Sequence, residues 1–364
     1  MDIRLYQCFA ADHRVSMDIY ADRVGDGLRQ IGHTVQQFRP EAWLERYKNN
    51  RLAMRWLRYV EYPKQLARLR ANDANTALVH HVVDHGYAHL VNAVDASRSF
   101  ISVHDLIPIL AWRGRFGSQH KGRKPVLALH SAKKLKQFGR LIASSQNTAD
   151  DLVRELDIPA SQIEVVPLPL AKDFIRCADA QIEKIRSRYG LSTDHFWILV
   201  SGSEFYKNHK TVLKVFNRLK AQGYPVKLLR AAKTGLQDSP FASMDADDIK
   251  SLYVPAHELP MLFSSVNCLL FPSLYEGFGY PVAEALACGT PVVCSNAASL
   301  PGVGGSVALY ADATDDQGLA QQVEQVINDS SITTMVRKKG PVQVQPFSAE
   351  SVAQELAARY RGLA

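Results

Sequence analysis

The chain has 364 residues, of which 46% are hydrophobic and 22% are charged, a globular composition with enough length for two domains. No apolar run approaches the roughly 20 residues of a membrane-spanning helix, and the start lacks the basic segment and long apolar core of a signal peptide. The net charge of +7 favours an anionic partner.

Apolar segments of strand length alternate with helical patterns along the first half of the chain. This alternation is typical of βαβ units, in which parallel strands are joined by helices, and it predicts a parallel sheet. The six expected strands cover residues 3–9, 34–38, 77–83, 99–103, 141–143 and 163–166.

A proline-containing stretch, VVPLPLAKDF (165–174), interrupts this pattern, and a polar stretch follows it. The alternation then restarts, which predicts a second α/β domain. We place the domains at residues 1–175 and 190–345. The second set of expected strands reads FWILVSG, PVKLLRA, SLYVP, NCLLFP, PVVCS and VALY.

The tail, residues 348–364, has the pattern of one amphipathic helix. Ser348 is the expected N-cap, and Phe347 with Val352 forms a hydrophobic staple. The expected apolar stripe is Val352, Leu356, Tyr360 and Leu363.

The segment SLYEGFGYPVAEALACGT (273–290) predicts a turn that leads from a strand into a helix. Gly277 and Gly279 permit close approach of a ligand to the backbone, and Pro281 suits a helix start. The helix N-terminus favours an anion, and carboxylates accept hydrogen bonds from sugar hydroxyls. Glu276 and Glu284 therefore indicate a phosphate and sugar site, although a surface charge and a dipole partner remain an alternative explanation.

Two segments, residues 45–70 and 112–124, combine basic with aromatic side chains. Such a composition suits an anionic membrane surface or nucleic acid, and a solvated helix face with buried aromatic residues is the simpler alternative. The cysteines are five in number and scattered, which indicates reduced, buried thiols in a cytosolic protein.

The segment EGFGYPVAEALACGTPVV (276–293) resembles the Glu-x(7)-Glu motif of the family-4 retaining glycosyltransferases of bacterial group 1 type. GSEFYKNHKTVLKVF (202–216) is similar to the Lys-Asn loop of that family, and VHDLIP (103–108) to its His-Asp loop. The resemblance covers nearly the whole chain. It implies the GT-B fold, in which two Rossmann-like domains face a cleft and a C-terminal helix crosses back to the N-terminal domain.

The resemblance also implies roles for individual residues. Glu276 holds the donor sugar, Glu284 accepts from the ribose and Lys207 neutralises the diphosphate, while Val254 lies in the loop that binds the base. His104 lies near the anomeric side of the sugar, so the implied catalytic residues are Glu276, His104 and Lys207. The implied donor site is completed by Gly202, Asn208, Gly277, Phe278, Gly279 and Tyr280. The weaker acceptor candidates are Asp84, His85 and Asp105.

The expected activity is therefore hexosyl transfer with retention, from a UDP- or GDP-linked sugar to a glycan or lipid-linked acceptor in cell-surface polysaccharide synthesis. We expect no metal or other cofactor, because lysine and the helix N-terminus take the place of a divalent ion. We further expect no nucleic-acid partner and peripheral attachment to an anionic membrane on its cytoplasmic face.

The chain departs from the family pattern in two places. FAADHRVSMD (9–18) replaces the glycine-rich first loop, and no arginine precedes Lys207, for which Lys210 or His209 is a possible substitute. Two other functions stay open, namely a sugar-nucleotide hydrolase or epimerase on the same fold and a non-catalytic basic binding module.

Two histidine patterns have alternative interpretations. A metal site at His81, His85 and His89 requires a helix, whereas the residues between them favour a strand and a loop. A catalytic triad built on His104 and Asp105 lacks a nucleophile elbow.

Overall fold

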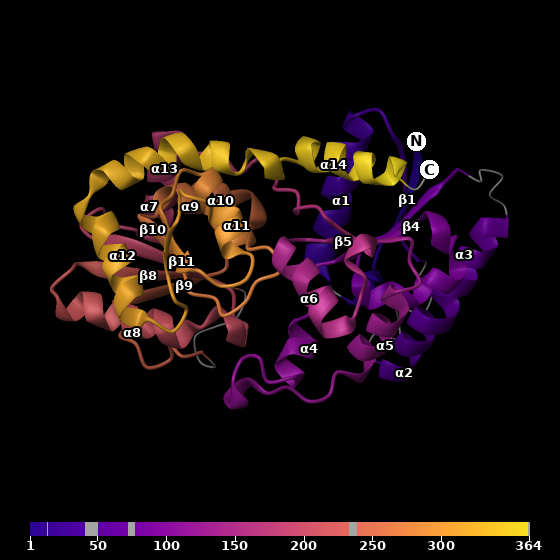
Figure 1. Cartoon of the computed structure of the whole chain (residues 1–364). Helices are drawn as coiled ribbons and strands as arrows, with labels where there is room; N and C mark the ends of the chain where they lie inside the picture. The colour runs from indigo at the N-terminus through magenta and orange to yellow at the C-terminus, as the bar shows by residue number, and fades with distance from the viewer. Residues whose placement is uncertain (13, 41–49, 72–76, 233–238, 363–364) are drawn as a thin grey trace. The chain divides into compact units, whose positions relative to one another are not determined.

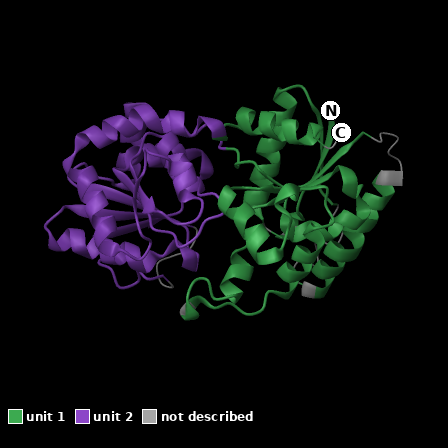
Figure 2. Ribbon diagram, in the orientation of Figure 1, with its two compact units in different colours: residues 1–169, 347–364 green, residues 170–346 purple. Residues whose placement is uncertain are grey.

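The computed structural model describes residues 1–12, 14–40, 50–71, 77–232 and 239–362 (Figure 1). Two compact units make up this part of the chain, one of residues 1–169 with 347–364 and one of residues 170–346 (Figure 2). Each unit contains a six-stranded parallel sheet with helices packed on it. The α/β fold class predicted from the alternation of apolar segments is confirmed.

The sheet of the first unit has the strand order β2-β1-β3-β4-β5-β6, and all neighbours in it are parallel. Each of the six expected strands forms, with ends that differ from the prediction by up to three residues. The strands are β1 (Asp2–Tyr6), β2 (Thr34–Phe38), β3 (Val79–Val82), β4 (Ser99–Val103), β5 (Arg140–Ala143) and β6 (Ile163–Val165).

Helices cover this first sheet and connect its strands. A π-helical turn, Leu57–Glu61, joins α2 to α3 without a break in the chain. The helices are α1 (Val15–Gln30), α2 (Arg51–Trp56), α3 (Tyr62–Ala71), α4 (Ile107–Trp112), α5 (Val126–Leu135), α6 (Gln146–Leu156) and α14 (Ala349–Arg361).

The C-terminal helix α14 packs against α1 and thereby belongs to the first unit, as predicted (Figure 1). Its N-cap is Ser348, whose side chain accepts a hydrogen bond from the Ser351 N–H at 3.2 Å. The close packing depends on Gly27, because a Cβ there would lie 2.6 Å from the Ala349 carbonyl oxygen. Of the predicted apolar stripe, Val352, Leu356 and Tyr360 are buried, and Leu363 lies outside the described residues.

The sheet of the second unit has the order β12-β11-β10-β7-β8-β9 and is also parallel. All six strands expected in this half of the chain form. They are β7 (Phe196–Ser201), β8 (Val226–Ala231), β9 (Ile249–Leu252), β10 (Cys268–Phe271), β11 (Val292–Ser295) and β12 (Leu309–Ala311).

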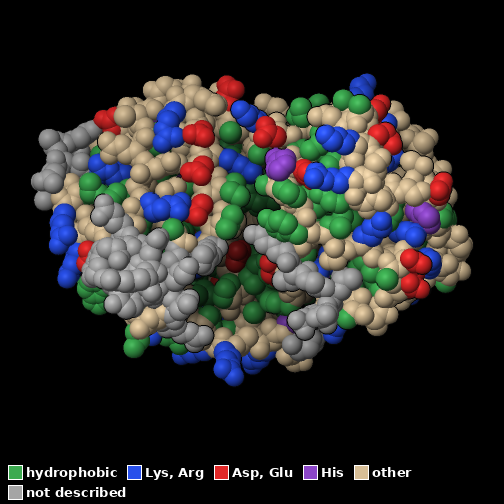
Figure 3. Space-filling view, turned by 180° about the vertical axis from the view of Figure 1, so that it is seen from behind, with side chains coloured by type: hydrophobic (Ala, Val, Ile, Leu, Met, Phe, Trp, Pro, Cys, Tyr) green, Lys and Arg blue, Asp and Glu red, His purple; other side chains and the backbone are tan. Residues whose placement is uncertain are grey.

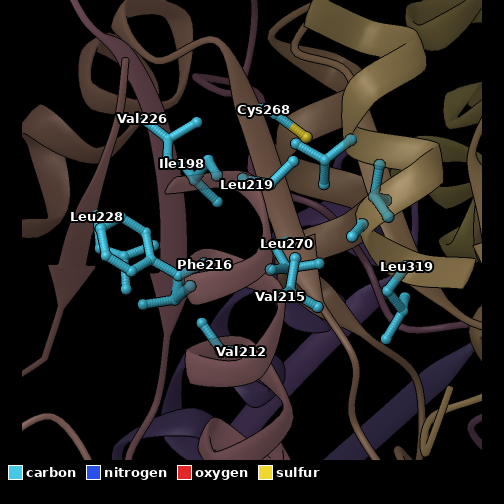
Figure 4. Packing of buried hydrophobic residues seen from close by; sticks show 14 of the residues in the cluster. Ile198, Val212, Val215, Phe216, Leu219, Val226, Leu228, Cys268, Leu270 and Leu319 are labelled. Atoms are coloured by element: carbon cyan, nitrogen blue, oxygen red, sulfur yellow. The ribbon is translucent and has the colours of Figure 1, made fainter. Parts of the chain in front are cut away.

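A hydrophobic core of the second unit lies between the helices α8 (His209–Ala221) and α12 (Asp316–Asn328) and the strands β7, β8 and β10 (Figure 4). Val212, Val215 and Phe216 recur at helical spacing along α8 and pack against the buried strand residues Ile198 and Leu270. The helices of this unit are α7 (Asp179–Tyr189), α8 (His209–Ala221), α9 (Leu259–Ser265), α10 (Tyr280–Ala287), α11 (Leu300–Gly304), α12 (Asp316–Asn328) and α13 (Ser330–Gln343).

All five cysteines are free thiols, and four of them are buried. Burial raises the pKa of the Cys268 thiol to about 12, which makes it unreactive at neutral pH. Within the described ranges, no helix has both the length and the apolar character that a bilayer crossing requires.

Candidate functional site

The turn between β10 and α10 carries the two glutamates of the predicted site. Gly279 is the N-cap of α10 and has a φ of +108°, a conformation that L side chains rarely adopt. A Cβ at this position would also lie 2.7 Å from Leu300 Cδ2. Ser299 Oγ lies 2.9 Å from the Glu276 carbonyl oxygen and 2.6 Å from that of Phe278, so its hydroxyl holds the turn in place.

Lys207 and Glu276 meet across the carboxyl ends of β7 and β10, which are neighbouring strands. The Lys207 ammonium donates to Glu276 Oε1 at 2.8 Å, and the two side chains are 11% and 10% exposed. The same ammonium lies 4.7 Å from the centre of the Phe271 ring. An ammonium has three N–H donors, so this pair leaves Lys207 with hydrogen-bonding capacity for an anion.

The loop after β7 positions this lysine. Gly202 has a φ of +81°, and a Cβ there would lie 2.9 Å from Lys207 Cε, so glycine allows the lysine side chain to lie along the backbone. Asn208 donates from Nδ2 to the carbonyl oxygens of Pro272 at 3.0 Å and Ala313 at 2.7 Å. The structure thus places Asn208 as a support for the loop, with its amide hydrogens directed at the backbone.

Helix α10 begins at Tyr280, so the positive end of its dipole lies at the glycine turn. Pro281 is its second residue, one position later than expected. Glu284 is the fifth residue, about one turn into the helix, and is partly buried. Phe278 is buried at the turn, whereas Gly277 and Tyr280 are partly exposed.

The remaining donor candidates lie outside the turn between β10 and α10. Val254 follows the edge strand β9 and is 9% exposed. His209 is buried, and burial lowers its pKa to about 4, so the ring is neutral at pH 7 and adds no charge in place of the missing arginine. Lys210 lies exposed in the first turn of α8.

In the first unit, His104 follows β4 and is 7% exposed. Its Nε2 lies 2.8 Å from the Val83 carbonyl oxygen and so carries the proton, and burial lowers the pKa of the ring. Nδ1 is then an acceptor, and it is buried without a hydrogen-bond partner in the described structure. Ser144 Oγ donates to the His104 carbonyl oxygen at 2.8 Å and fixes the backbone of the His-Asp loop.

Asp84, an acceptor candidate, is fully enclosed and bonded within the protein. Its carboxylate pairs with Arg14 and accepts from the Gly86 N–H at 2.7 Å. Burial alone would raise the pKa of this carboxyl, but His85 and the Arg14 guanidinium hold it well below its usual range. Asp84 therefore anchors the loop that replaces the glycine-rich segment, and Arg14, 38% exposed, is the charge this loop presents.

The other two acceptor candidates differ in their surroundings. Asp105 accepts from the Ile107 N–H at 2.9 Å, which makes it a support for the start of α4. His85 is partly exposed, and its Nδ1 lies 3.8 Å from Asp84 Oδ1. Within the described residues, no group of three or more His, Cys, Asp or Glu side chains is arranged to hold a metal ion.

The histidine ladder considered for a metal does not form a helix face. His80 and His81 lie on β3, and a 3-10 helix begins at His85. His80 forms a hydrogen bond with the Tyr6 hydroxyl, and His89 forms one with the Arg58 carbonyl oxygen. Both side chains are therefore part of the hydrogen-bonded interior of the first unit.

Arg14 and Ser299 were missed by the sequence reasoning. Arg14 is a cation in the segment between the first strand and α1, but its pairing with Asp84 requires β1 and β3 to be neighbours, which the sequence does not show. Ser299 has no local signal, because it lies about 20 residues beyond the turn that it holds.

Two family models match the chain, and between them they cover most of it. The model described as glycosyl transferases group 1 matches residues 181–342, and the model described as glycosyltransferase family 4 matches residues 11–172.

Curated relatives include two mannosyltransferases. O-antigen chain mannosyltransferase B from Escherichia coli is 28% identical over 230 residues, which are 61% of this chain and 60% of the relative. The MMP alpha-(1->4)-mannosyltransferase from Mycolicibacterium hassiacum is 26% identical over 62% of this chain and 54% of the relative. The chain therefore spans less than two thirds of the length of either relative.

Solved structures share the fold over the full length. Sucrose-phosphate synthase from Thermosynechococcus elongatus superposes with a TM-score of 0.77 at 18% identity, covering 100% of this chain and 99% of that one. HepE from Anabaena in complex with UDP-glucose gives a TM-score of 0.73 at 16% identity, covering 100% of both chains.

Proposed function

We propose that this chain, which belongs to the group 1 and family 4 glycosyltransferases, transfers a sugar from a nucleoside-diphosphate donor to a hydroxyl group of a glycan. The observation that carries the proposal is the pair of Lys207 and Glu276, 2.8 Å apart and nearly buried at the carboxyl edge of the second sheet. Ligands of open parallel sheets bind at this edge.

The charges of this site suit a sugar that is joined to a diphosphate leaving group. Lys207 and the N-terminal end of α10 supply positive potential for the phosphates. Glu276 accepts hydrogen bonds from sugar hydroxyls, and Glu284, one turn further along α10, accepts from the ribose. With these charges in place, the proposed reaction needs no divalent metal.

We further propose that the anomeric configuration is retained by front-face substitution. The departing diphosphate oxygen takes the proton of the acceptor hydroxyl while the new bond forms on the same face of the sugar. Double displacement would need a carboxylate nucleophile on the opposite face. Asp84 is ion-paired in the interior and Asp105 supports the start of α4, so neither is poised for that role.

The mannosyltransferases among the relatives support a mannosyl donor and a surface polysaccharide as the acceptor. The complex of HepE with UDP-glucose supports the nucleoside-diphosphate sugar as the donor class. GDP-mannose is thus the first donor to test, with UDP-glucose beside it.

Peripheral attachment to an anionic membrane on the cytoplasmic side is part of the proposal. Helix α2 exposes Leu52 (75%) and Trp56 (41%) beside the exposed Arg55, while α5 exposes Val126 (65%). Apolar side chains flanked by cations suit the headgroup region of a bilayer. Arg46 and Lys48, which belong to the predicted basic segment, lie outside the described residues.

A screen for thermal stabilisation by nucleotide sugars tests the proposed donor site, because a ligand that binds the folded state raises its melting temperature. GDP-mannose or UDP-glucose is expected to stabilise the wild type and to lose this effect in Lys207→Ala. Lys184→Ala, which removes an exposed lysine from α7 of the same unit, is the matched control. Equal stabilisation of all three proteins would contradict the assigned donor site.

A further inference from the structure

A cavity of about 450 Å³ lies in the second unit at the opposite edge of the sheet from Lys207 and Glu276. It is bordered by Phe196, Asn267 and Pro291, which lie at the amino ends of β7, β10 and β11. The proposed transfer reaction makes no use of this edge. The volume falls within the range of small-molecule sites.

Three arginines from separate segments line this cavity, and its lining also includes a set of apolar side chains, here called the apolar floor. Arg176 precedes α7, Arg186 lies on α7 and Arg337 lies on α13. The floor is made by Ile182, Phe196, Val266, Pro291, Val326 and Ile327.

The acidic neighbours of these arginines neutralise them weakly. Arg176 lies 3.5 Å from Asp179, whose side chain is 93% exposed, and Arg186 lies 3.5 Å from Glu183, which is 64% exposed. Such exposed pairs are screened by water and contribute little. Arg337 forms no ion pair within the part of the chain that the structure describes.

Arg337 is held beside a second positive charge. The Arg337 side chain is exposed, but partial desolvation and, after it, the like charge of Arg176 lower the pKa of its guanidinium, while the Asp179 carboxylate raises it. Gly289, with a φ of +70°, allows α13 to approach, because a Cβ there would lie 3.1 Å from Arg337 Cγ and 3.3 Å from its Cα. A bound anion would relieve the repulsion between the two guanidinium groups.

Asn267 adds a neutral donor to the same cavity. Its Oδ1 accepts from the Trp197 N–H at 2.8 Å, so the hydrogen-bond donor of this side chain is Nδ2. The three guanidinium groups outnumber the two carboxylates of the lining, Asp179 and Glu183, and guanidinium groups are suited to two-pronged binding of phosphate.

We propose that this cavity is a binding site for a small organic phosphate, whose phosphate group is held by Arg176 and Arg337 and whose carbon skeleton lies on the apolar floor. A phosphate is favoured over a neutral sugar because three cations line a cavity with two largely solvated carboxylates. The site is distinct from the proposed donor site and does not depend on the transfer reaction.

Isothermal titration with mannose 6-phosphate, and separately with inorganic phosphate, tests the proposal. The sugar phosphate is expected to bind the wild type and Lys207→Ala equally, since Lys207 serves the other edge of the sheet. Arg176→Gln/Arg337→Gln is expected to weaken binding by about tenfold or more, because charged hydrogen bonds are lost. Lys184→Gln/Lys338→Gln removes the same charge from exposed positions on α7 and α13 and is expected to bind normally.

Three outcomes would overturn the site: no binding to the wild type, loss of binding in Lys207→Ala, or unchanged binding in the double arginine variant. Protection of Arg337 in the wild type from phenylglyoxal by mannose 6-phosphate provides a second readout, which does not depend on the folding of any variant. Equal modification with and without the sugar phosphate would also contradict the proposal. Binding of inorganic phosphate alone, without the sugar phosphate, would contradict the role of the apolar floor.

Discussion

Lys207 and Glu276 depend on each other, because both side chains are about nine-tenths buried. Removal of either side chain deletes a contact between opposite charges at a largely buried position, and breaking such a pair typically costs about 3 kcal/mol of folding stability. We expect Lys207→Met and Glu276→Gln to destabilise strongly one at a time and less than additively together. Urea unfolding of both single variants and the double variant measures the coupling, and additive losses would show that the pair is not formed in solution.

The two glutamates of the motif are expected to differ in kinetics. Glu276→Ala should lower kcat by about a hundredfold or more, because this carboxylate is assigned to the reacting sugar, where charge develops. Glu284→Ala should mainly raise the KM for the donor, since it anchors the ribose. Steady-state kinetics with varied donor distinguish the two, and a larger kcat loss in Glu284→Ala would reverse the assignment.

His81 gives the fold a predictable sensitivity to acid. It lies at the centre of a buried network, 2.6 Å from the Tyr360 hydroxyl and 2.8 Å from Ser102 Oγ, and burial lowers its pKa to about 3. In the unfolded chain this histidine has an ordinary pKa near 6.5. Between pH 6.5 and pH 3 it is therefore protonated in the unfolded chain but neutral in the folded protein. Stability should therefore fall as the pH falls below 6.5.

The size of this effect can be measured with one substitution. His81→Gln keeps hydrogen-bonding groups but does not titrate, so it should remove about 1.4 kcal/mol per pH unit from the slope between pH 6 and pH 4. The free energy of unfolding in urea, determined at several pH values for both proteins, provides the comparison. His89 and His209, whose pKa values are also lowered, leave a residual slope in the variant. If the free energy of unfolding had the same pH dependence in both proteins, the assignment of the effect to His81 would be contradicted.

At the scale of elements, the docking of α14 on α1 depends on the absence of a side chain at one position. Gly27→Ala should destabilise the protein by about 1–3 kcal/mol, because its Cβ would meet a backbone carbonyl oxygen that cannot move alone. Gly25→Ala in the same helix is the control, since its Cβ would meet the flexible ends of the Gln37 and Arg29 side chains rather than backbone, and alanine is the better helix former. Thermal melting of both variants tests this, and equal melting temperatures would contradict the packing argument.

The strands were predictable, but the partners that assemble the sites were less so. A short apolar run such as FWILVSG predicts a buried strand without information from the rest of the chain, and all twelve expected strands form. The order of strands is set by long-range packing, and it alone brings Arg14 to Asp84 and Lys207 to Glu276. The motif with its two glutamates was visible because it is local, whereas Arg14 and Ser299 act across distant segments.

The cavity in the second unit was likewise not predictable from local sequence patterns. Its three arginines come from positions 176, 186 and 337, and no spacing in the sequence connects the last with the first two. The packing of α13 near Gly289 joins them, and it depends on a backbone conformation rather than on a pattern of residue types.

At the scale of the whole molecule, the face seen in Figure 3 does not gather its described basic side chains into one patch. Basic and acidic side chains are interspersed over the visible described residues of both units in Figure 3. A membrane contact would therefore depend on local features, such as the exposed apolar and basic side chains of α2, rather than on the net charge of +7.

Flotation with anionic vesicles tests this contact. Leu52→Ser/Trp56→Ser should reduce binding at low salt by about tenfold, because two exposed apolar side chains are lost from the proposed contact. Val342→Ser removes an apolar side chain of 71% exposure from the second unit and should have no effect. If high salt left vesicle binding unchanged, the electrostatic contribution would be contradicted. An equal loss of binding in Val342→Ser would contradict the assignment of the contact to α2.

The most direct test of the central claim is NMR of the product formed from GDP-mannose and an oligosaccharide acceptor in excess chelator. The account predicts stoichiometric release of GDP and an α-mannosidic linkage, with the configuration of the donor retained and no divalent metal required. A β-linked product would contradict retention, and strict dependence on added Mg²⁺ or Mn²⁺ would contradict the role given to Lys207 and the N-terminus of α10. Release of free mannose, with none joined to the acceptor, would show a hydrolase instead.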